Sequence, residues 1–259
     1  MSLSRQAQTE LTRIAAKAGQ LLHQHGAESR LVEQTTQRLG MALGARSIEL
    51  SVSPDAIVIT SLFEDDCVTT TRRCYDRGIN MQMVCDVQRI CIMAEKKLLE
   101  ADQVKERLNR LKPMKYNRWA VVLMIGLACG SFSHFFGGDW PVYITTFFAS
   151  AGAMTIRQEI AHRQHNPLVN FAVAAFVATT IASVGVIFQF GEKPEIALAA
   201  SVLLLVPGFP LINAVSDMLK GHISMGIARW VFASLLTLSV SVGIVASMAL
   251  TGVVAWIGS

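Results

Sequence analysis

The pattern of apolar and polar positions divides the chain into two parts of different character. Over residues 1–112, apolar residues recur at helical or strand spacing among polar ones, which is typical of a water-soluble domain. From residue 113 to 259, long apolar runs follow one another with few charged residues between them. The pattern predicts a cytoplasmic α+β domain over 1–112, followed by an all-α transmembrane domain over 113–259.

The front part is predicted to combine helices with a small antiparallel sheet. Apolar residues repeat at helical spacing over 4–25, and Gly26 is expected to end that helix. A second helix is expected over 28–43. Alternating or apolar segments then predict three antiparallel strands, over 47–53, 56–63 and 67–74.

The remainder of the front part is predicted to be largely helical. Residues 81–84 are interpreted as a short fourth strand, so the sheet is expected to have three or four strands. Helices are expected over 87–99 and 102–111, and Pro113 follows the second of them. A domain of this length can hold its own apolar core.

Five apolar runs are long enough to be predicted as membrane spans. They cover residues 118–136, 140–157, 168–190, 195–220 and 226–256. Basic residues gather at 105–118 before the first span, and Arg157 and Arg163 lie between the second and third spans. The positive-inside rule then places the front domain in the cytoplasm and the C-terminus in the periplasm.

Two prolines interrupt the fourth predicted span, so that it should be broken at Pro207-Gly208-Phe209-Pro210. In hydrocarbon, irregular backbone persists only where it is packed in protein or lines a cavity. Secondary transporters use such broken helices to bind anionic groups of their substrates. These four residues are therefore candidates for a substrate-binding site or pathway, and a kink that serves packing alone is the alternative.

Three polar side chains extend this candidate site. Asn213 and Asp217 are spaced i, i+4 and should share one helix face. An aspartate at membrane depth is rare and usually functional, although Lys220 follows closely and an interfacial charge is the alternative. Arg157, at the inner end of the second span, is the candidate cation for a substrate carboxylate, but arginines at helix ends also commonly extend to the membrane surface.

Composition supports the membrane assignment and excludes several other classes. The chain is 52% hydrophobic with a mean hydropathy of +0.41, too apolar for an ordinary soluble protein. Residues 1–118 hold 18 of the 23 Lys and Arg and 14 of the 19 Asp and Glu. The net charge of +4 is small, and nucleic-acid binding is not expected. The five cysteines form no C-x-x-C motif and are expected to be reduced thiols.

No enzyme or metal site is predicted. His23, His25 and Glu28 combine suitable ligand types, but residues two apart on a helix point in different directions, and a helix end at Gly26 intervenes. No phosphate-binding G-x-x-x-x-G-K-[ST] motif occurs, so uphill transport would draw on an ion gradient or a partner. No catalytic residue and no cofactor is expected.

Several segments resemble a known family. They are LLHQHGAES at 21–29, GINM at 78–81, TFFAS at 146–150, SVLLLVPGFPLINA at 201–214 with Asp217 and Gly221, and ARW at 228–230. On these segments the chain, from about residue 5 to 257, resembles the threonine/serine exporter family, and most of all its split form. The resemblance implies export of small metabolites from the cytoplasm, threonine and serine for fused members and succinate for the split type.

The split form implies a partner. Fused members carry a second membrane half after the fifth span, whereas this sequence stops at Ser259. The resemblance implies a small multi-span membrane protein that supplies this half, within an oligomer in the bacterial inner membrane. The expected function is therefore a subunit of a secondary exporter of small carboxylates, chiefly succinate. A threonine/serine exporter subunit and a membrane-anchored sensor or enzyme domain are the alternatives.

Overall fold

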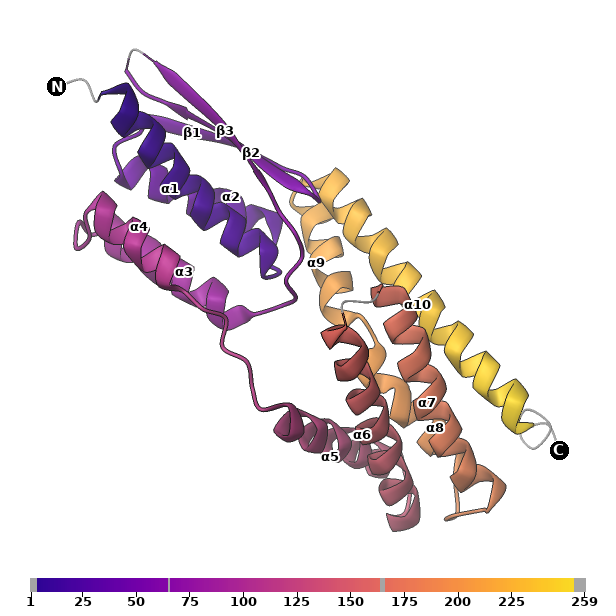
Figure 1. Cartoon of the computed structure of the whole chain (residues 1–259). Helices are drawn as coiled ribbons and strands as arrows, with labels where there is room; N and C mark the ends of the chain where they lie inside the picture. The colour runs from indigo at the N-terminus through magenta and orange to yellow at the C-terminus, as the bar shows by residue number, and fades with distance from the viewer. Residues whose placement is uncertain (1–3, 65, 164–165, 254–259) are drawn as a thin grey trace. The chain divides into compact units, whose positions relative to one another are not determined.

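The computed structural model describes residues 4–64, 66–163 and 166–253 (Figure 1). The front part contains α1 (Arg5–Gln24), α2 (Ser29–Ala42), β1 (Ser47–Val52), β2 (Ala56–Leu62), β3 (Cys67–Arg73), α3 (Met81–Glu95) and α4 (Ala101–Arg110). The apolar part contains α5 (Arg118–Phe135), α6 (Trp140–His162), α7 (Pro167–Ile187), α8 (Glu195–Val202), the 3-10 helix η1 (Leu203–Leu205), α9 (Gly208–Leu219) and α10 (Ile223–Thr251).

Contacts along the chain group these elements into two compact units. The front unit comprises Met1–Lys115 together with Phe209–Trp230, and the apolar unit comprises Tyr116–Gly208 together with Val231–Ser259. Nearly all of α9 and the first two turns of α10 therefore belong with the front helices and sheet. The predicted change from cytoplasmic to membrane domain near residue 112 concerns topology in a bilayer and stays a prediction.

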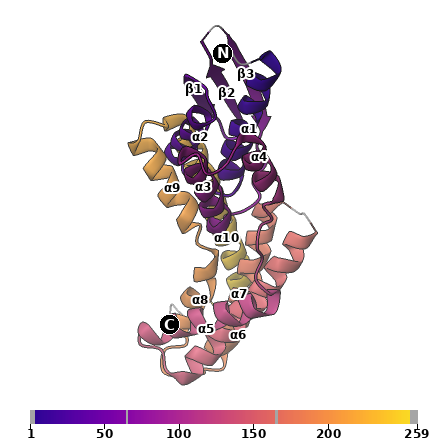
Figure 2. The same ribbon diagram turned by 90° about the vertical axis from the view of Figure 1, so that its left-hand side faces the viewer.

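The front unit is layered. Its strands form an antiparallel meander in the order β1-β2-β3, as predicted, with Ile59 of β2 opposite Thr70 of β3. Helices α1 and α2 cover the inner face of this sheet, and α3 and α4 pack against the opposite side of α1 and α2 (Figures 1 and 2). Two apolar clusters fill the spaces between the layers, around Ile57 and Ile59 on the sheet side and around Leu22 and Val87 on the other.

Helix α1 ends at the predicted glycine. Gly26 has a φ of +86°, a conformation that costs glycine little because it has no Cβ. The N–H groups of Gly26 and Ala27 donate to the carbonyl oxygens of His23 and Leu22, which pairs the last carbonyls of the helix. The chain then turns through Glu28 into α2.

The predicted fourth strand is wrong, because residues 81–84 form the first turn of α3. Asn80 is extended, and its side-chain oxygen accepts a hydrogen bond from the N–H of Met83 at 3.1 Å. This cap satisfies one of the free donors at a helix start and favours a helix from Met81 onward. Met83 and Val84 then continue the buried face of α3, and the described sheet has three strands.

Three helices of the described chain are long and apolar enough to cross a membrane, namely α5, α7 and α10. A fourth span is counted if α8, η1 and α9 form one interrupted span. Helix α6 is not among them, because no stretch of it is sufficiently apolar, although it packs against α5 and α7. The five predicted spans are therefore not confirmed, and the end of the fifth, 254–256, lies outside the described residues.

Candidate functional site

The apolar run after Glu195 is interrupted at Val206 and Pro207, between η1 and α9. Val206 is extended, with a ψ of 122°, because the ring of the following proline excludes the helical conformation. The helix resumes at Gly208, and Pro210 lies in the first turn of α9, where a missing N–H costs little. The predicted break of the helix is confirmed, but it lies at Val206 and Pro207, whereas Gly208, Phe209 and Pro210 already belong to α9.

One face of α9 contacts the turn that joins α1 to α2. The side-chain amide of Asn213 donates to the carbonyl oxygen of Gly26 at 2.9 Å. One helical turn later, Asp217 accepts hydrogen bonds from the backbone N–H of Ser29 at 2.8 Å and from its hydroxyl at 3.0 Å. The two polar residues share one face of α9, as their spacing predicts, and both bind residues of this turn.

The carboxylate of Asp217 is completely buried and fully paired. Besides Ser29, it accepts a hydrogen bond from Nη1 of Arg229 on α10 at 2.7 Å. The second terminal nitrogen of Arg229 donates to the carbonyl oxygen of Ala27, also at 2.7 Å. Buried charges are tolerated in proteins when they are paired and hydrogen-bonded in this way. Asp217 and Arg229 thus hold α2, α9, α10 and the intervening turn together.

A more exposed ion pair lies beside this buried one. Glu28 accepts hydrogen bonds from Nζ of Lys220 at 2.6 Å and from the hydroxyl of Ser216 at 2.9 Å. The hydrogen bond from Lys220 lowers the pKa of Glu28, and Ser216 lowers it further. Exposed pairs of this type stabilise a protein by at most about 1 kcal/mol, so the buried pair dominates the contact.

Two histidines lie near this turn: the ring of His25 is close to a backbone carbonyl, and the pKa of His23 is lowered. Nδ1 of His25 lies 2.8 Å from the carbonyl oxygen of Leu21, and the side chain is buried. Burial and the neighbouring charge of Arg229 lower the pKa of His23, which keeps its ring neutral. Within the described ranges no group of three or more His, Cys, Asp or Glu could hold a metal ion.

Arg157 lies on α6 in the apolar unit. Its guanidinium is 4.6 Å from the ring centroid of Phe171, a cation–π contact, and its backbone carbonyl accepts a hydrogen bond from the amide of Asn170 at 3.2 Å. Among the residues that the structure describes, no carboxylate lies within ion-pair distance of Arg157. Its predicted contact with a substrate carboxylate stays a prediction.

Sequence reasoning assigned no role to two members of the buried network, Ser29 and Arg229. Arg229 could have been noticed, since it is a single cation at the start of a long apolar run and follows Asp217 by 12 positions. A cation and a carboxylate near membrane depth are expected to pair. Ser29 carried no such signal, because a serine at a helix start is common.

Comparison with known proteins identifies the family. The family model described as "Putative threonine/serine exporter" matches residues 13–251. The chain belongs to the threonine/serine exporter family. That membership, together with the apolar helices, makes it a membrane transport protein. No solved structure gives a significant match to the chain.

Two members of the threonine/serine exporter family are similar over almost their whole length. A Klebsiella aerogenes protein named "Probable succinate transporter subunit YjjP" is 50% identical over 99% of this chain and 100% of its own. The Escherichia coli K12 protein of the same name is 50% identical over 96% of this chain and 98% of its own. A Mycobacterium tuberculosis protein named "Probable threonine/serine exporter" is 23% identical, over 84% of this chain and 42% of its own.

Proposed function

We propose that this chain is one subunit of a secondary exporter of small carboxylates in the bacterial inner membrane, with succinate as its main substrate. The observation that carries the proposal is the 50% identity, over nearly the whole chain, to two proteins named as succinate transporter subunits. Threonine and serine are the alternative substrates, supported by the name of the distant relative.

The proposal includes a topology and a partner. The chain crosses the membrane in the five spans predicted from the sequence, with residues 1–112 in the cytoplasm and the C-terminus in the periplasm. The basic residues that precede the first span support this orientation. The second component is a small multi-span membrane protein, and the complex is an oligomer. The word "subunit" in the names of the two similar proteins supports such a partner.

The proposed pathway uses the residues that the sequence singles out. Pro207 lies in the break, Gly208, Phe209 and Pro210 are the first residues of the helix that follows it, and Asn213 is a hydrogen-bonding group. Asp217 is the gating carboxylate, and Arg157 is a cation that meets the substrate.

The contacts of Asp217 suggest how protonation of its carboxylate would change the structure. Protonation would remove its charge and so weaken the ion pair with Arg229 and the hydrogen bond from the backbone N–H of Ser29. The contact of α9 with the turn between α1 and α2 would then loosen. In this mechanism the proton-linked step changes a contact within the front unit.

Efflux from loaded proteoliposomes that contain the chain and its small partner tests the proposal. Vesicles loaded with labelled succinate should lose it faster than matched vesicles lose labelled threonine. Asp217→Asn should abolish succinate efflux or remove its dependence on pH, and Arg157→Gln should slow it. Glu192→Gln is the matched control, because it removes one exposed carboxylate outside the proposed pathway.

The outcomes separate the alternatives. Preferential efflux of threonine would make threonine the substrate and would still support a transport function. Full efflux with unchanged pH dependence in Asp217→Asn would show that this carboxylate is not a gate. No efflux of either compound from a folded complex would favour a membrane-anchored sensor or enzyme.

A further inference from the structure

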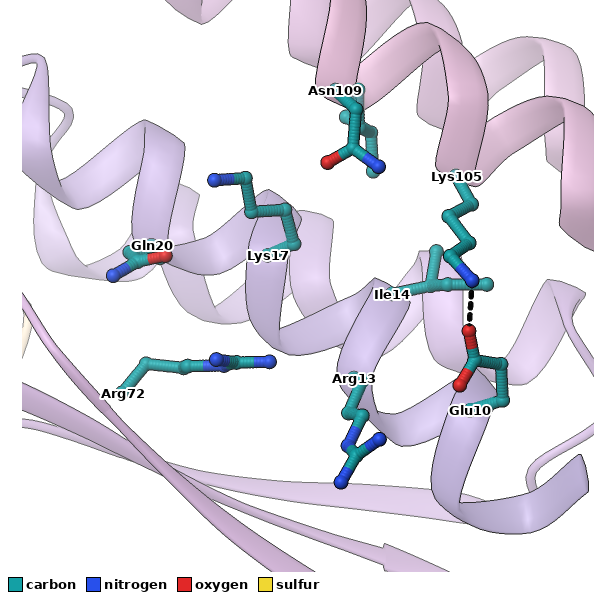
Figure 3. A pocket seen from close by; sticks show the side chains of 9 residues that line it. Glu10, Arg13, Ile14, Lys17, Gln20, Arg72, Lys105 and Asn109 are labelled. Carbon is teal, nitrogen blue, oxygen red and sulfur yellow. Dashed lines mark hydrogen bonds and ion pairs between the residues drawn. The ribbon is translucent and has the colours of Figure 1, made fainter. Parts of the chain in front are cut away.

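A cavity of about 480 Å³ lies in the front unit between α1, β3 and α4. Its polar lining includes Glu10, Arg13 and Lys17 of α1, Arg72 of β3, and Lys105 and Asn109 of α4. In Figure 3 the side chain of Arg72 extends from the sheet toward α1, with Lys17 and Arg13 on the facing helix. The volume is within the range of small-molecule sites.

The lining carries an excess of positive charge. Among the described residues that line it, four side chains are cations and Glu10 is the only carboxylate, so three positive charges remain. Glu10 is engaged by Lys105, with which it forms a hydrogen-bonded ion pair (Figure 3). In the part of the chain that the structure describes, Arg13, Lys17 and Arg72 have no carboxylate within ion-pair distance. These three side chains are available to an anion.

Arg72 has a buried donor without an acceptor. Its Nε lies out of reach of solvent and makes no hydrogen bond to any described residue. An unsatisfied buried donor costs about 1–3 kcal/mol, and more when it is charged, so such groups are uncommon in native proteins. An anion bound in the cavity against this guanidinium would balance its positive charge, which is costly to bury unpaired.

The surroundings of Lys17 also disfavour its positive charge. Partial burial lowers its pKa, and the charges of Arg77 and Arg72 lower it further. Mutual repulsion among these cations is relieved when a negative charge is placed between them. The charge on Lys17 would therefore be favoured by the same ligand that pairs Arg72.

We propose that this cavity is a binding site for a small metabolite anion with at least two negative charges, carried by carboxylate or phosphate groups. Arg72 binds the anion through its guanidinium, and Lys17 and Arg13 complete the charge balance. The site is separate from the proposed transport pathway and does not depend on it. It lies along α1, the helix that precedes Gly26, whose carbonyl oxygen accepts a hydrogen bond from Asn213 of α9.

Calorimetric titration of the purified full chain in detergent, at constant ionic strength, tests this site. The probes are succinate and inorganic phosphate as the two sources of a dianion, with acetate as a monoanion. At least one dianion should bind in a saturable manner, and acetate should bind more weakly. Which dianion binds more tightly distinguishes a carboxylate from a phosphate ligand.

Variants locate the binding. Arg72→Gln and Lys17→Gln should each weaken dianion binding by about tenfold or more, the effect of losing one charge-assisted hydrogen bond. Arg46→Gln is the control, because it removes the same charge from an exposed arginine outside the cavity and should leave the affinity within about twofold. Circular dichroism of each variant checks that it remains folded.

Two results would overturn the proposal. If Arg72→Gln, Lys17→Gln and Arg46→Gln weakened dianion binding equally, the binding would reflect general attraction to a basic protein. If the folded chain showed no saturable dianion binding, the cavity would not be a binding site.

Asp217→Asn, a substitution in the proposed transport pathway, shows whether succinate binds in the cavity or in that pathway. Succinate binding that survives in this variant but is lost in Arg72→Gln belongs to the cavity, and the reverse pattern belongs to the pathway.

Discussion

Asp217 on α9 caps the start of α2 through Ser29, a residue 188 positions away in the sequence. Both carboxylate oxygens are used, one by the backbone N–H of Ser29 and the other by its hydroxyl. Glu28, which precedes α2, makes no side-chain capping bond of its own. The negative charge of Asp217 therefore satisfies a free donor and interacts favourably with the helix dipole at this end.

Asp217→Asn is expected to destabilise the front unit by about 3–5 kcal/mol, because it leaves the buried guanidinium of Arg229 without a counter-charge. Arg229→Gln should cost a similar amount for the complementary reason. The double variant should be less destabilised than the sum of the two, since neither charge then remains unpaired. Unfolding of the full chain in detergent, followed by circular dichroism, measures the three values. If the destabilisation of the double variant equalled the sum of the two single values, the two charges would not interact.

Gly226→Ala is expected to disrupt the contact between α9 and α10. A Cβ at this position would lie 2.8 Å from the carbonyl oxygen of Ala214 and 3.0 Å from the backbone nitrogen of Met218, so the two helices would have to move apart. Overpacking of this type costs about 1–3 kcal/mol. Gly208→Ala is the matched control, because a Cβ there meets no atom within 4 Å. Equal unfolding temperatures for the two variants would contradict the close approach.

The cysteines of the front unit should differ sharply in reactivity. Burial raises the pKa of Cys74 to about 11 and that of Cys91 to about 12, whereas Cys67 and Cys85 are exposed. At pH 8 roughly one in a thousand Cys74 side chains would be a thiolate, the reactive form. Maleimide labelling of the native chain, read by mass spectrometry, should modify Cys67 and Cys85 first. Equal rates at all four would contradict the described packing.

His23 should make the protein less stable as the pH falls. Its pKa is lowered in the folded protein by burial and by Arg229, so the unfolded chain binds the proton more readily. Stability is complete above the unfolded value of about 6.5 and decreases as the pH drops below it. His23→Gln should reduce this dependence below about pH 6.5, in thermal unfolding measured at several pH values.

Much of the local structure could be predicted because its causes are local. Alternation of apolar residues predicted the three-strand meander, and Gly26 predicted the end of α1. Pro207 breaks the fourth apolar run because a proline within a helix removes a backbone hydrogen bond and disfavours the helical conformation of the residue before it. The error at residues 81–84 is also local, since the capping side chain of Asn80 outweighed the apolar pattern.

The sequence by itself determined that Asn213 and Asp217 share a face, because the helical repeat alone sets that relation. It could not determine what this face binds. Gly26, Ser29 and Arg229 come to Asp217 and Asn213 from other helices and turns, and only the tertiary packing of α1, α2, α9 and α10 brings them within hydrogen-bond distance. Helix periodicity and proline depend on residues that are neighbours in the sequence. Ion pairs and hydrogen bonds depend on residues that are close in space, so the partners of Asp217 and Asn213 were decided by the tertiary structure.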